Sequence, residues 1–246
     1  HTIADFPKLL RLGIHGIIKE IQLEIRKLSE NELSQKDTLQ AMTLCLSSVA
    51  LYAKHLADES FKLAEKEFNL TRKEELLQIA KICNKVPFSP AETLQEALTS
   101  IWIFWTALHI ENTNAGLSLG RMDQWLQPYF DYEIKKLKTK EEKHDYIKKA
   151  IELVGCFYLR CTDHLPLIPD IGNFLFGGSS SDQAITLGGQ TPNGENAVND
   201  MTYIFLKVTE MLCLRDPNVN ARFTPNINSQ NYLKRRAYYK NIITIA

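Results

Sequence analysis

The sequence lacks an excess of charge of either sign: 29 Lys and Arg residues stand against 29 Asp and Glu residues among 246, so the formal net charge is zero. The basic residues are scattered, which leaves no electrostatic footprint for a nucleic-acid backbone. Long hydrophobic runs are also missing, because the longest apolar stretch, residues 101–109, is far shorter than the roughly 20 residues of a membrane-spanning helix. We therefore expect neither nucleic acid nor a membrane as a partner.

Cysteine is too sparse and irregular for a disulfide framework, because the five cysteines are an odd number spread over the whole sequence. Such a pattern is typical of a reducing compartment, and we expect the cytoplasm. Cys156, Cys161, Asp163 and His164 group metal-ligand residue types, but they lack the Cys-x2-Cys pair of zinc sites. We expect no metal here and interpret the two cysteines as buried thiols near a helix end.

Several signatures of catalysis and targeting are missing as well. The Gly177-Gly178 and Gly188-Gly189 pairs belong to no phosphate-binding glycine motif, and no Gly-x-Ser-x-Gly nucleophile elbow is present. The first residues, 1–5, contain no initiator Met and no signal-peptide segment. We therefore expect a fragment of a longer protein.

Helical periodicity dominates the first two thirds of the chain. Apolar residues recur every three or four positions, and Ser/Thr-x-x-Glu capping boxes mark helix starts at Thr71, Ser89 and Thr139. The helix after Ser89 is apolar on nearly every side, so we expect it to be buried in a larger body. The predicted helices cover about residues 6–29 and 34–69, a segment from 71, and residues 89–108 and 139–159.

The last third, from about residue 163, consists of short β-prone runs separated by glycine, proline and asparagine turns. The order is a strand at 184–187, a helix at 197–212, an extended run at 218–223, a helix capped by Ser229 and a β-prone end at 241–246. This alternation predicts an α/β architecture with helices outside a sheet or barrel.

Spacing alone gives only weak candidates for chemistry. His109 and Glu111 are two positions apart at a helix end, where such side chains do not face each other, so a structural terminus is the better interpretation. The polar stretch 112–121 follows the most apolar helix and contains two glycines. It predicts either a pocket wall or a hydrogen-bonded connection between two helices.

A set of sequence blocks, in order along the whole chain, resembles the pyruvate formate-lyase-type domain of the glycyl-radical enzymes. Each block alone is weakly specific, whereas the ordered set is strongly so. The pattern is most similar to the diol dehydratase and C–N or C–S lyase branch. The blocks are HTIADF (1–6), PAETLQEAL (90–98), ALHIE (107–111), SLGRMDQ (118–124), TLGG (186–189) with Gly194, AVNDMTY (197–203) and PNVNAR (217–222).

The resemblance implies an α/β fold, a ten-stranded barrel built of two five-stranded halves and wrapped in helices. This chain would be a predominantly helical fragment of that barrel. Residues 1–246 would form one partial pyruvate formate-lyase-type domain, truncated at both ends. Within it, residues 1–162 would form mainly the helical wrap and residues 163–246 the barrel strands with their helices.

The family resemblance also implies a chemistry. An S-adenosylmethionine radical activating enzyme installs a glycyl radical in the protein, the radical passes to a cysteine, and the thiyl takes a hydrogen atom from the substrate while a nearby glutamate acts as base. The sequence contains neither a Gly-Cys-Val-Glu-like nor an Arg-Val-x-Gly-Tyr-like motif. The chain is therefore expected to hold no catalytic residue of its own, to bind no separate cofactor and to be inactive alone.

Substrate contacts follow from the resemblance, position by position. His1 and Ser118 match positions that face substrate hydroxyls in the diol dehydratase branch. Phe174 and Phe176 fall where the family has an aromatic pocket wall. Arg222 is interpreted either as a buried structural ion partner or as a contact to an anionic substrate group.

The blocks around residues 174–183 and 215–223 are most similar to sulfonate-cleaving members of the family, of which isethionate sulfite-lyase is one. Glycerol or propanediol dehydratase and choline lyase are the alternatives. The implied partners are a small-molecule substrate, the radical activating enzyme and a second copy in a homodimer. A hypothesis of another class is a non-catalytic helical scaffold or interaction protein that retains the fold.

Overall fold

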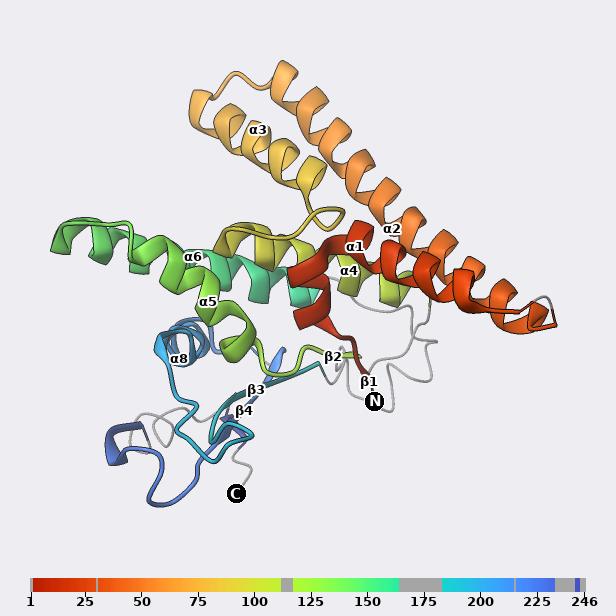
Figure 1. The fold of residues 1–246 in the computed structure, drawn as a ribbon. Helices are drawn as coiled ribbons and strands as arrows, with labels where there is room; N and C mark the ends of the chain where they lie inside the picture. Colours follow the sequence, from red (N-terminus) through yellow and green to blue (C-terminus); the bar gives the residue numbers. More distant parts are fainter. Residues whose placement is uncertain are drawn as a thin grey trace, which may run out of the picture. The chain divides into compact units, whose positions relative to one another are not determined.

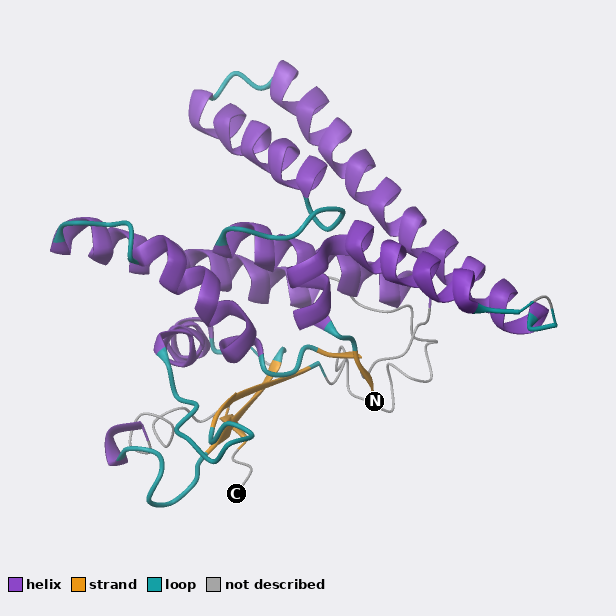
Figure 2. Ribbon diagram, viewed as in Figure 1, coloured by secondary structure: helices purple, strands orange, loops and turns teal. Residues whose placement is uncertain are grey.

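The computed structural model describes residues 2–29, 31–111, 117–163, 183–214, 216–232 and 242–243 (Figure 1). The chain forms two compact units, which are residues 5–107 and residues 1–4 together with 108–246. All described strands belong to the second unit, whereas the first is helical (Figure 2). None of the described helices is long and apolar enough to cross a membrane.

The helical unit contains α1 (Phe6–Lys27), α2 (Leu33–Lys66), α3 (Leu70–Lys85) and most of α4 (Leu94–Glu111). The Asp5 side chain caps α1 by accepting the Lys8 N–H at 3.0 Å. A small core joins α2, α3 and α4 through Ala53, Ala57, Cys83 and Ile103. The predicted helices at 6–29, 34–69 and 139–159 are confirmed within a few residues.

The three predicted capping boxes have different outcomes. At Thr139 the box is confirmed, because Glu142 accepts the Thr139 N–H at 2.9 Å and Thr139 Oγ1 accepts the Glu142 N–H at 3.1 Å. At Thr71 the box is wrong: α3 begins one residue earlier, and the Asn69 side chain accepts the Arg72 N–H at 3.1 Å. Asn is a stronger N-cap residue than Thr, and Asn69 precedes Thr71 in the chain, so the helix begins after Asn69.

The box at Ser89 is also wrong, because its backbone is used elsewhere. The Ser89 N–H donates to the Lys85 carbonyl at 2.8 Å, and the Ala91 N–H donates to the Leu10 carbonyl at 3.1 Å. The helix therefore starts only at Leu94, with Thr93 Oγ1 accepting the Glu96 N–H at 3.2 Å.

Among its described residues, the strand-bearing unit has five parallel strand segments. β1 (Thr2–Ile3) pairs with β2 (Leu117–Ser118), and β3 (Ala184–Gly188), β4 (Asn218–Arg222) and β5 (Ile242–Ile243) form a second sheet in the order β3-β4-β5. A parallel bridge between Gly120 and Ile185 links the two sheets. The segments therefore follow one another in chain order, as in one five-stranded half of the barrel, and the α/β class is confirmed.

Helices α5 (Met122–Ile134), α6 (Lys140–Asp163) and α8 (Asp200–Leu212) belong to the same unit, and α5 contacts β3 (Figure 1). One face of the β3–β4 pair is fully buried through Ile185, Leu187, Val219 and Ala221, each 2 % exposed or less. The division expected at residues 162–163 stays a prediction, since the compact units divide the chain at other residues.

Candidate functional site

The chain turns sharply where β3 ends, at Gly188 and Gly189. Both residues have positive φ values, 63° and 75°, which favour glycine. A Cβ atom at Gly188 would collide with the Tyr232 hydroxyl, and a Cβ atom at Gly189 would lie 2.8 Å from the Arg222 Cβ atom. The two glycines thus allow the end of β3 to lie directly against the end of β4 and the residues after it.

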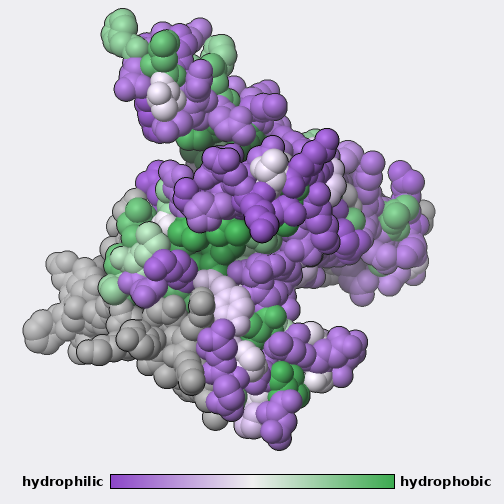
Figure 3. Space-filling model, turned by 90° about the vertical axis from the view of Figure 1, so that its left-hand side faces the viewer, coloured by the Kyte–Doolittle hydropathy of each residue, from purple (hydrophilic) through white to green (hydrophobic). Residues whose placement is uncertain are grey.

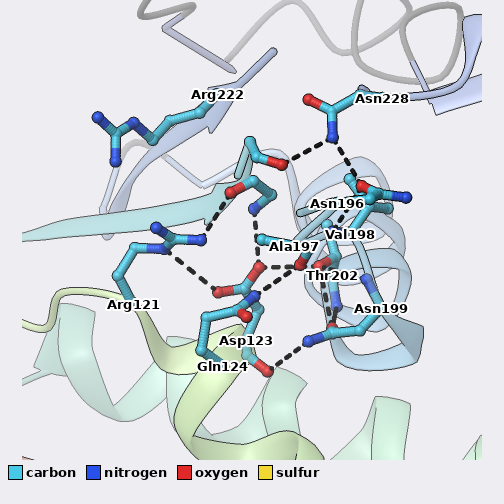
Figure 4. Close-up of polar contacts among 12 residues, drawn as sticks. Arg121, Asp123, Gln124, Asn196, Ala197, Val198, Asn199, Thr202, Arg222 and Asn228 are labelled. Carbon is cyan, nitrogen blue, oxygen red and sulfur yellow. Dashed lines mark hydrogen bonds and ion pairs between the residues drawn. The ribbon is translucent and has the colours of Figure 1, made fainter. Parts of the chain in front are cut away.

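A buried carboxylate holds this turn. Asp123, at the start of α5, has no exposed surface. Its Oδ2 atom accepts the Gly188 N–H at 2.7 Å and the Thr202 hydroxyl at 2.8 Å (Figure 4). The Arg121 guanidinium donates to the Gly188 carbonyl at 2.7 Å, and its Nε atom lies 3.9 Å from Asp123 Oδ1. We call Arg121, Asp123, Gly188 and Thr202 the strand-end clasp.

The electrostatics of the strand-end clasp are dominated by desolvation. Burial raises the pKa of the Asp123 carboxyl above its ordinary value. The hydrogen bonds from Gly188 and Thr202 and the charge of Arg121 act in the opposite direction without cancelling that effect. Because protein donors occupy Oδ2 and a cation lies beside Oδ1, the carboxylate holds backbone rather than substrate.

The start of α8 completes the arrangement. Asn199 caps the helix by accepting the Thr202 N–H at 2.8 Å, and its Nδ2 donates to the Asp123 carbonyl at 3.1 Å. On the other side of the turn, Asn228 Nδ2 donates to the Gly189 carbonyl and to Asn196 Oδ1, both at 2.7 Å (Figure 4). Segments far apart in sequence are thereby fixed at one end of the parallel strands, the end at which α/β proteins carry their binding sites.

The structure describes two of the five predicted site residues. Ser118 is half-buried on β2, where its Cα pairs with Ile3 of β1. Arg222 ends β4 opposite Gly188 and is exposed. This exposure contradicts the interpretation of Arg222 as a buried structural ion partner and leaves the anion contact as a prediction.

The other three predicted site residues, His1, Phe174 and Phe176, lie outside the described residues.

The structure also describes part of the weaker candidates. His109 is buried on α4, whereas the side chain of Glu111 and residues 112–116 lie outside the description. In the remainder of the polar stretch, Leu117 and Leu119 are buried and Arg121 belongs to the strand-end clasp. This part of the stretch therefore forms β2 and the start of the clasp.

The buried cysteines have no activated thiol. Burial raises the pKa of Cys83 to about 11, and burial together with the charge of Asp216 raises the pKa of Cys161. Cys156 is exposed, so only Cys161 of the expected pair is a buried thiol. Neither buried cysteine is therefore an activated thiolate nucleophile.

A surface groove of about 490 Å³ lies between helices α5, α6 and α8. Figure 3 shows this side of the molecule, with apolar side chains gathered among polar ones. The apolar lining of the groove comes from Phe130, Ile147, Ile151 and Ile204. Lys207 and Glu210, which also line the groove, form an ion pair at 2.8 Å. Helices alone form the groove, and none of the predicted site residues that are described lines it.

Sequence reasoning missed the roles of Asp123, Asn199, Thr202 and Asn228. Asp123, Asn199 and Thr202 fall inside the sequence blocks quoted above, but nothing in their spacing indicated that they meet. The one local signal was Asn199-x-x-Thr202, a capping box in which Thr202 Oγ1 in turn accepts the Asn199 N–H at 3.1 Å.

Comparison with known proteins gives concordant results. A family model described as pyruvate formate lyase-like matches residues 1–240. The chain is 32% identical over 226 residues to isethionate sulfite-lyase of Nitratidesulfovibrio vulgaris, covering 89% of this chain and 27% of that protein. It is 30% identical over 235 residues to (2S)-3-sulfopropanediol dehydratase of Klebsiella oxytoca, covering 92% and 27%.

Solved structures agree. The structure of the enzyme for 1,2-propanediol dehydration in Roseburia inulinivorans matches with a TM-score of 0.87 and 29% identity, over 96% of this chain and 29% of that one. The chain thus spans about a quarter to a third of the length of these relatives. On this evidence the chain belongs to the pyruvate formate lyase-like family of glycyl-radical enzymes.

Proposed function

We propose that this chain is part of a glycyl-radical lyase or dehydratase that cleaves a C–X bond in a small polar substrate. The observation that carries the proposal is the set of five parallel strand segments in chain order, with Ser118 and Arg222 on two of them. The relatives that match along nearly the whole chain are named as a lyase and as dehydratases, which supports the same class.

The reacting groups belong to other parts of such an enzyme. A glycyl radical, installed by a radical activating enzyme, would supply the unpaired electron for hydrogen abstraction by a cysteine thiyl. No motif for either residue occurs among the 246 residues. We therefore propose that the chain alone has no turnover and contributes binding, orientation and exclusion of water.

The roles of this chain's residues follow from their chemistry. The hydroxyl of Ser118 and the imidazole of His1 would hold substrate hydroxyls, since each offers both a donor and an acceptor. Phe174 and Phe176 would form an apolar wall, and Arg222 would hold an anionic group. The buried sheet face of Ile185, Leu187, Val219 and Ala221 would keep water away from one side of the substrate. Radical intermediates require such exclusion of water.

Among substrates we favour a sulfonate, with isethionate as the first choice, because sulfonate chemistry appears in the names of relatives at 30% identity and above. Dehydration of propanediol or glycerol is the second candidate, favoured by the structural match at a TM-score of 0.87. Choline cleavage is a weaker alternative. The proposal includes a cytoplasmic enzyme that forms a homodimer and meets its activating enzyme there.

The test uses the full-length protein, activated without oxygen by its activating enzyme and offered isethionate, propanediol, glycerol and choline in separate reactions. We expect release of sulfite from isethionate. If a diol is consumed and isethionate is not, the enzyme is a dehydratase. If the full-length sequence lacks both radical motifs and no substrate is consumed, the non-catalytic scaffold is the correct alternative.

A further inference from the structure

The β3–β4 pair has two faces of opposite character. In the parallel register, Thr186 pairs with Asn220, and Gly188 pairs with Arg222. Side chains alternate along a strand, so these residues share one face with Ala184 and Asn218, and the buried apolar side chains occupy the other. We call Thr186, Asn218, Asn220 and Arg222 the β3–β4 polar face.

The polar groups of this face have no partners in the described part of the chain. No hydrogen bond or ion pair there involves the side chain of Thr186, Asn218, Asn220 or Arg222. Asn220 is the informative residue, because it is only 7 % exposed. An amide so little exposed has few water contacts to replace a hydrogen bond, so a small ligand on this face would find an available donor and acceptor.

The strand-end clasp, at the end of β3, shows the contrast. Asp123 Oδ2 accepts the Thr202 hydroxyl, and the nearby Asn228 side chain makes three hydrogen bonds at 2.7 Å. Figure 4 shows the Arg222 side chain extending away from these contacts. The polar side chains of the β3–β4 polar face thus stay outside the hydrogen bonds of the clasp, which leaves them available to a ligand.

The chemistry of the β3–β4 polar face selects the ligand. Its side chains provide a guanidinium, two amides and a hydroxyl, and none of the described residues on this face is acidic. Paired residues on neighbouring strands lie about 5 Å apart and alternate residues on one strand about 7 Å apart, so Asn220 and Arg222 can reach one small oxyanion together. Arg binds such groups through two parallel hydrogen bonds.

We propose that the β3–β4 polar face binds the anionic end of the substrate, a sulfonate or carboxylate, with Arg222 as the charge and Asn220 as the buried donor. This inference rests on the proposed function, since it names the substrate class of that enzyme's cavity. It adds Thr186, Asn218 and Asn220 to the residues that hold the substrate.

The experiment measures binding by titration calorimetry to the full-length protein before activation, when no turnover occurs. The probes are isethionate, inorganic sulfate and neutral 1,2-propanediol. The variants are Asn220→Asp, which keeps the shape and replaces a donor by a negative charge, and Arg222→Gln. Asn193→Asp in an exposed turn and Arg72→Gln on α3 are the matched controls.

We expect both test variants to weaken isethionate binding at least about tenfold and to leave propanediol binding and the melting temperature unchanged. The controls should not change either affinity. Sulfate binding with isethionate binding absent would identify a site for the free oxyanion only and overturn the substrate assignment.

Unchanged isethionate affinity in both test variants would overturn the proposal, and so would failure of the unaltered protein to bind isethionate. An equal loss of isethionate and propanediol binding would also contradict it, because it would indicate a general structural role. The proposed function is tested separately from these outcomes. If the activated enzyme dehydrates a diol but does not bind isethionate, the proposed function stands and the proposed anion site is wrong.

Discussion

The strand-end clasp and the β3–β4 polar face adjoin each other at Gly188, and their polar groups differ in how they are hydrogen-bonded. In the clasp, Oδ2 of a fully buried carboxylate accepts a backbone N–H and a hydroxyl, and a guanidinium donates to a carbonyl, at 2.7–2.8 Å. On the polar face, an amide that is 7 % exposed has no hydrogen bond within the described residues. We infer that the clasp residues stabilise the fold and that the residues of the polar face are available to a ligand.

The largest expected effect comes from breaking the strand-end clasp. Asp123→Ala removes the acceptor of the Gly188 N–H and the Thr202 hydroxyl and leaves Arg121 without its nearby charge. We expect a loss of about 3 kcal/mol in the free energy of unfolding, measured by urea denaturation. The control is Asp145→Ala, an exposed residue paired with Lys148, which should cost less than about 1 kcal/mol. Equal losses in the free energy of unfolding for Asp123→Ala and Asp145→Ala would show that Asp123 has no special structural role.

A smaller effect is expected from Gly188→Ala. The new methyl group would meet the Tyr232 hydroxyl, and the positive φ adds strain, so we expect a loss of about 2 kcal/mol in the free energy of unfolding. Gly194→Ala is the control, since Gly194 has a φ of 82° with no atom near its Cβ position, and it isolates the strain at about 1 kcal/mol. Thermal denaturation that shows the same loss in both variants would contradict the close contact with Tyr232.

The protonation of Asp123 should appear in the pH dependence of stability. Its folded-state pKa is raised above the ordinary value of 3.8, so the native state binds this proton more tightly than the unfolded state. The resulting stabilisation is fully present below the ordinary pKa and is lost as pH rises through the raised pKa. Between about pH 7 and pH 4, the unaltered protein should gain stability relative to Asp123→Asn. If the free energies of unfolding of the two proteins, measured by urea denaturation, depend on pH in the same way, Asp123 keeps its ordinary pKa.

The smallest effect, and the one that sharpens the comparison, is expected on the polar face. Asn220→Leu replaces an unpartnered amide by an apolar group of similar shape, so the free energy of unfolding should stay within about 0.5 kcal/mol or rise. Asn228→Leu, which removes three hydrogen bonds, is the counterpart and should cost about 2 kcal/mol. If Asn220→Leu destabilises the protein as much as Asn228→Leu does, Asn220 is structural and the contrast between the two regions disappears.

The sequence predicted elements whose signals are local. The capping box at Thr139, the strand at 184–187 and the extended run at 218–223 each depend on neighbouring residues, and all three are confirmed. β1 and β2 were missed because strands of two residues have no periodicity to detect. The box at Ser89 failed because a contact to Leu10, far away in the sequence, uses its backbone.

The candidate site was harder to predict for the same reason. Asp123 meets partners 65 and 79 positions away, and no pattern within one segment encodes such a meeting. The family resemblance supplied Ser118 and Arg222, whereas the role of Asn220 required the register of β3 against β4 and the burial of each face.

The most direct test of the central claim is electron paramagnetic resonance of the full-length protein after anaerobic incubation with its activating enzyme and S-adenosylmethionine. The account predicts a glycyl-radical signal together with consumption of isethionate or of a diol. Complete activation conditions that give neither a radical signal nor substrate loss would contradict it.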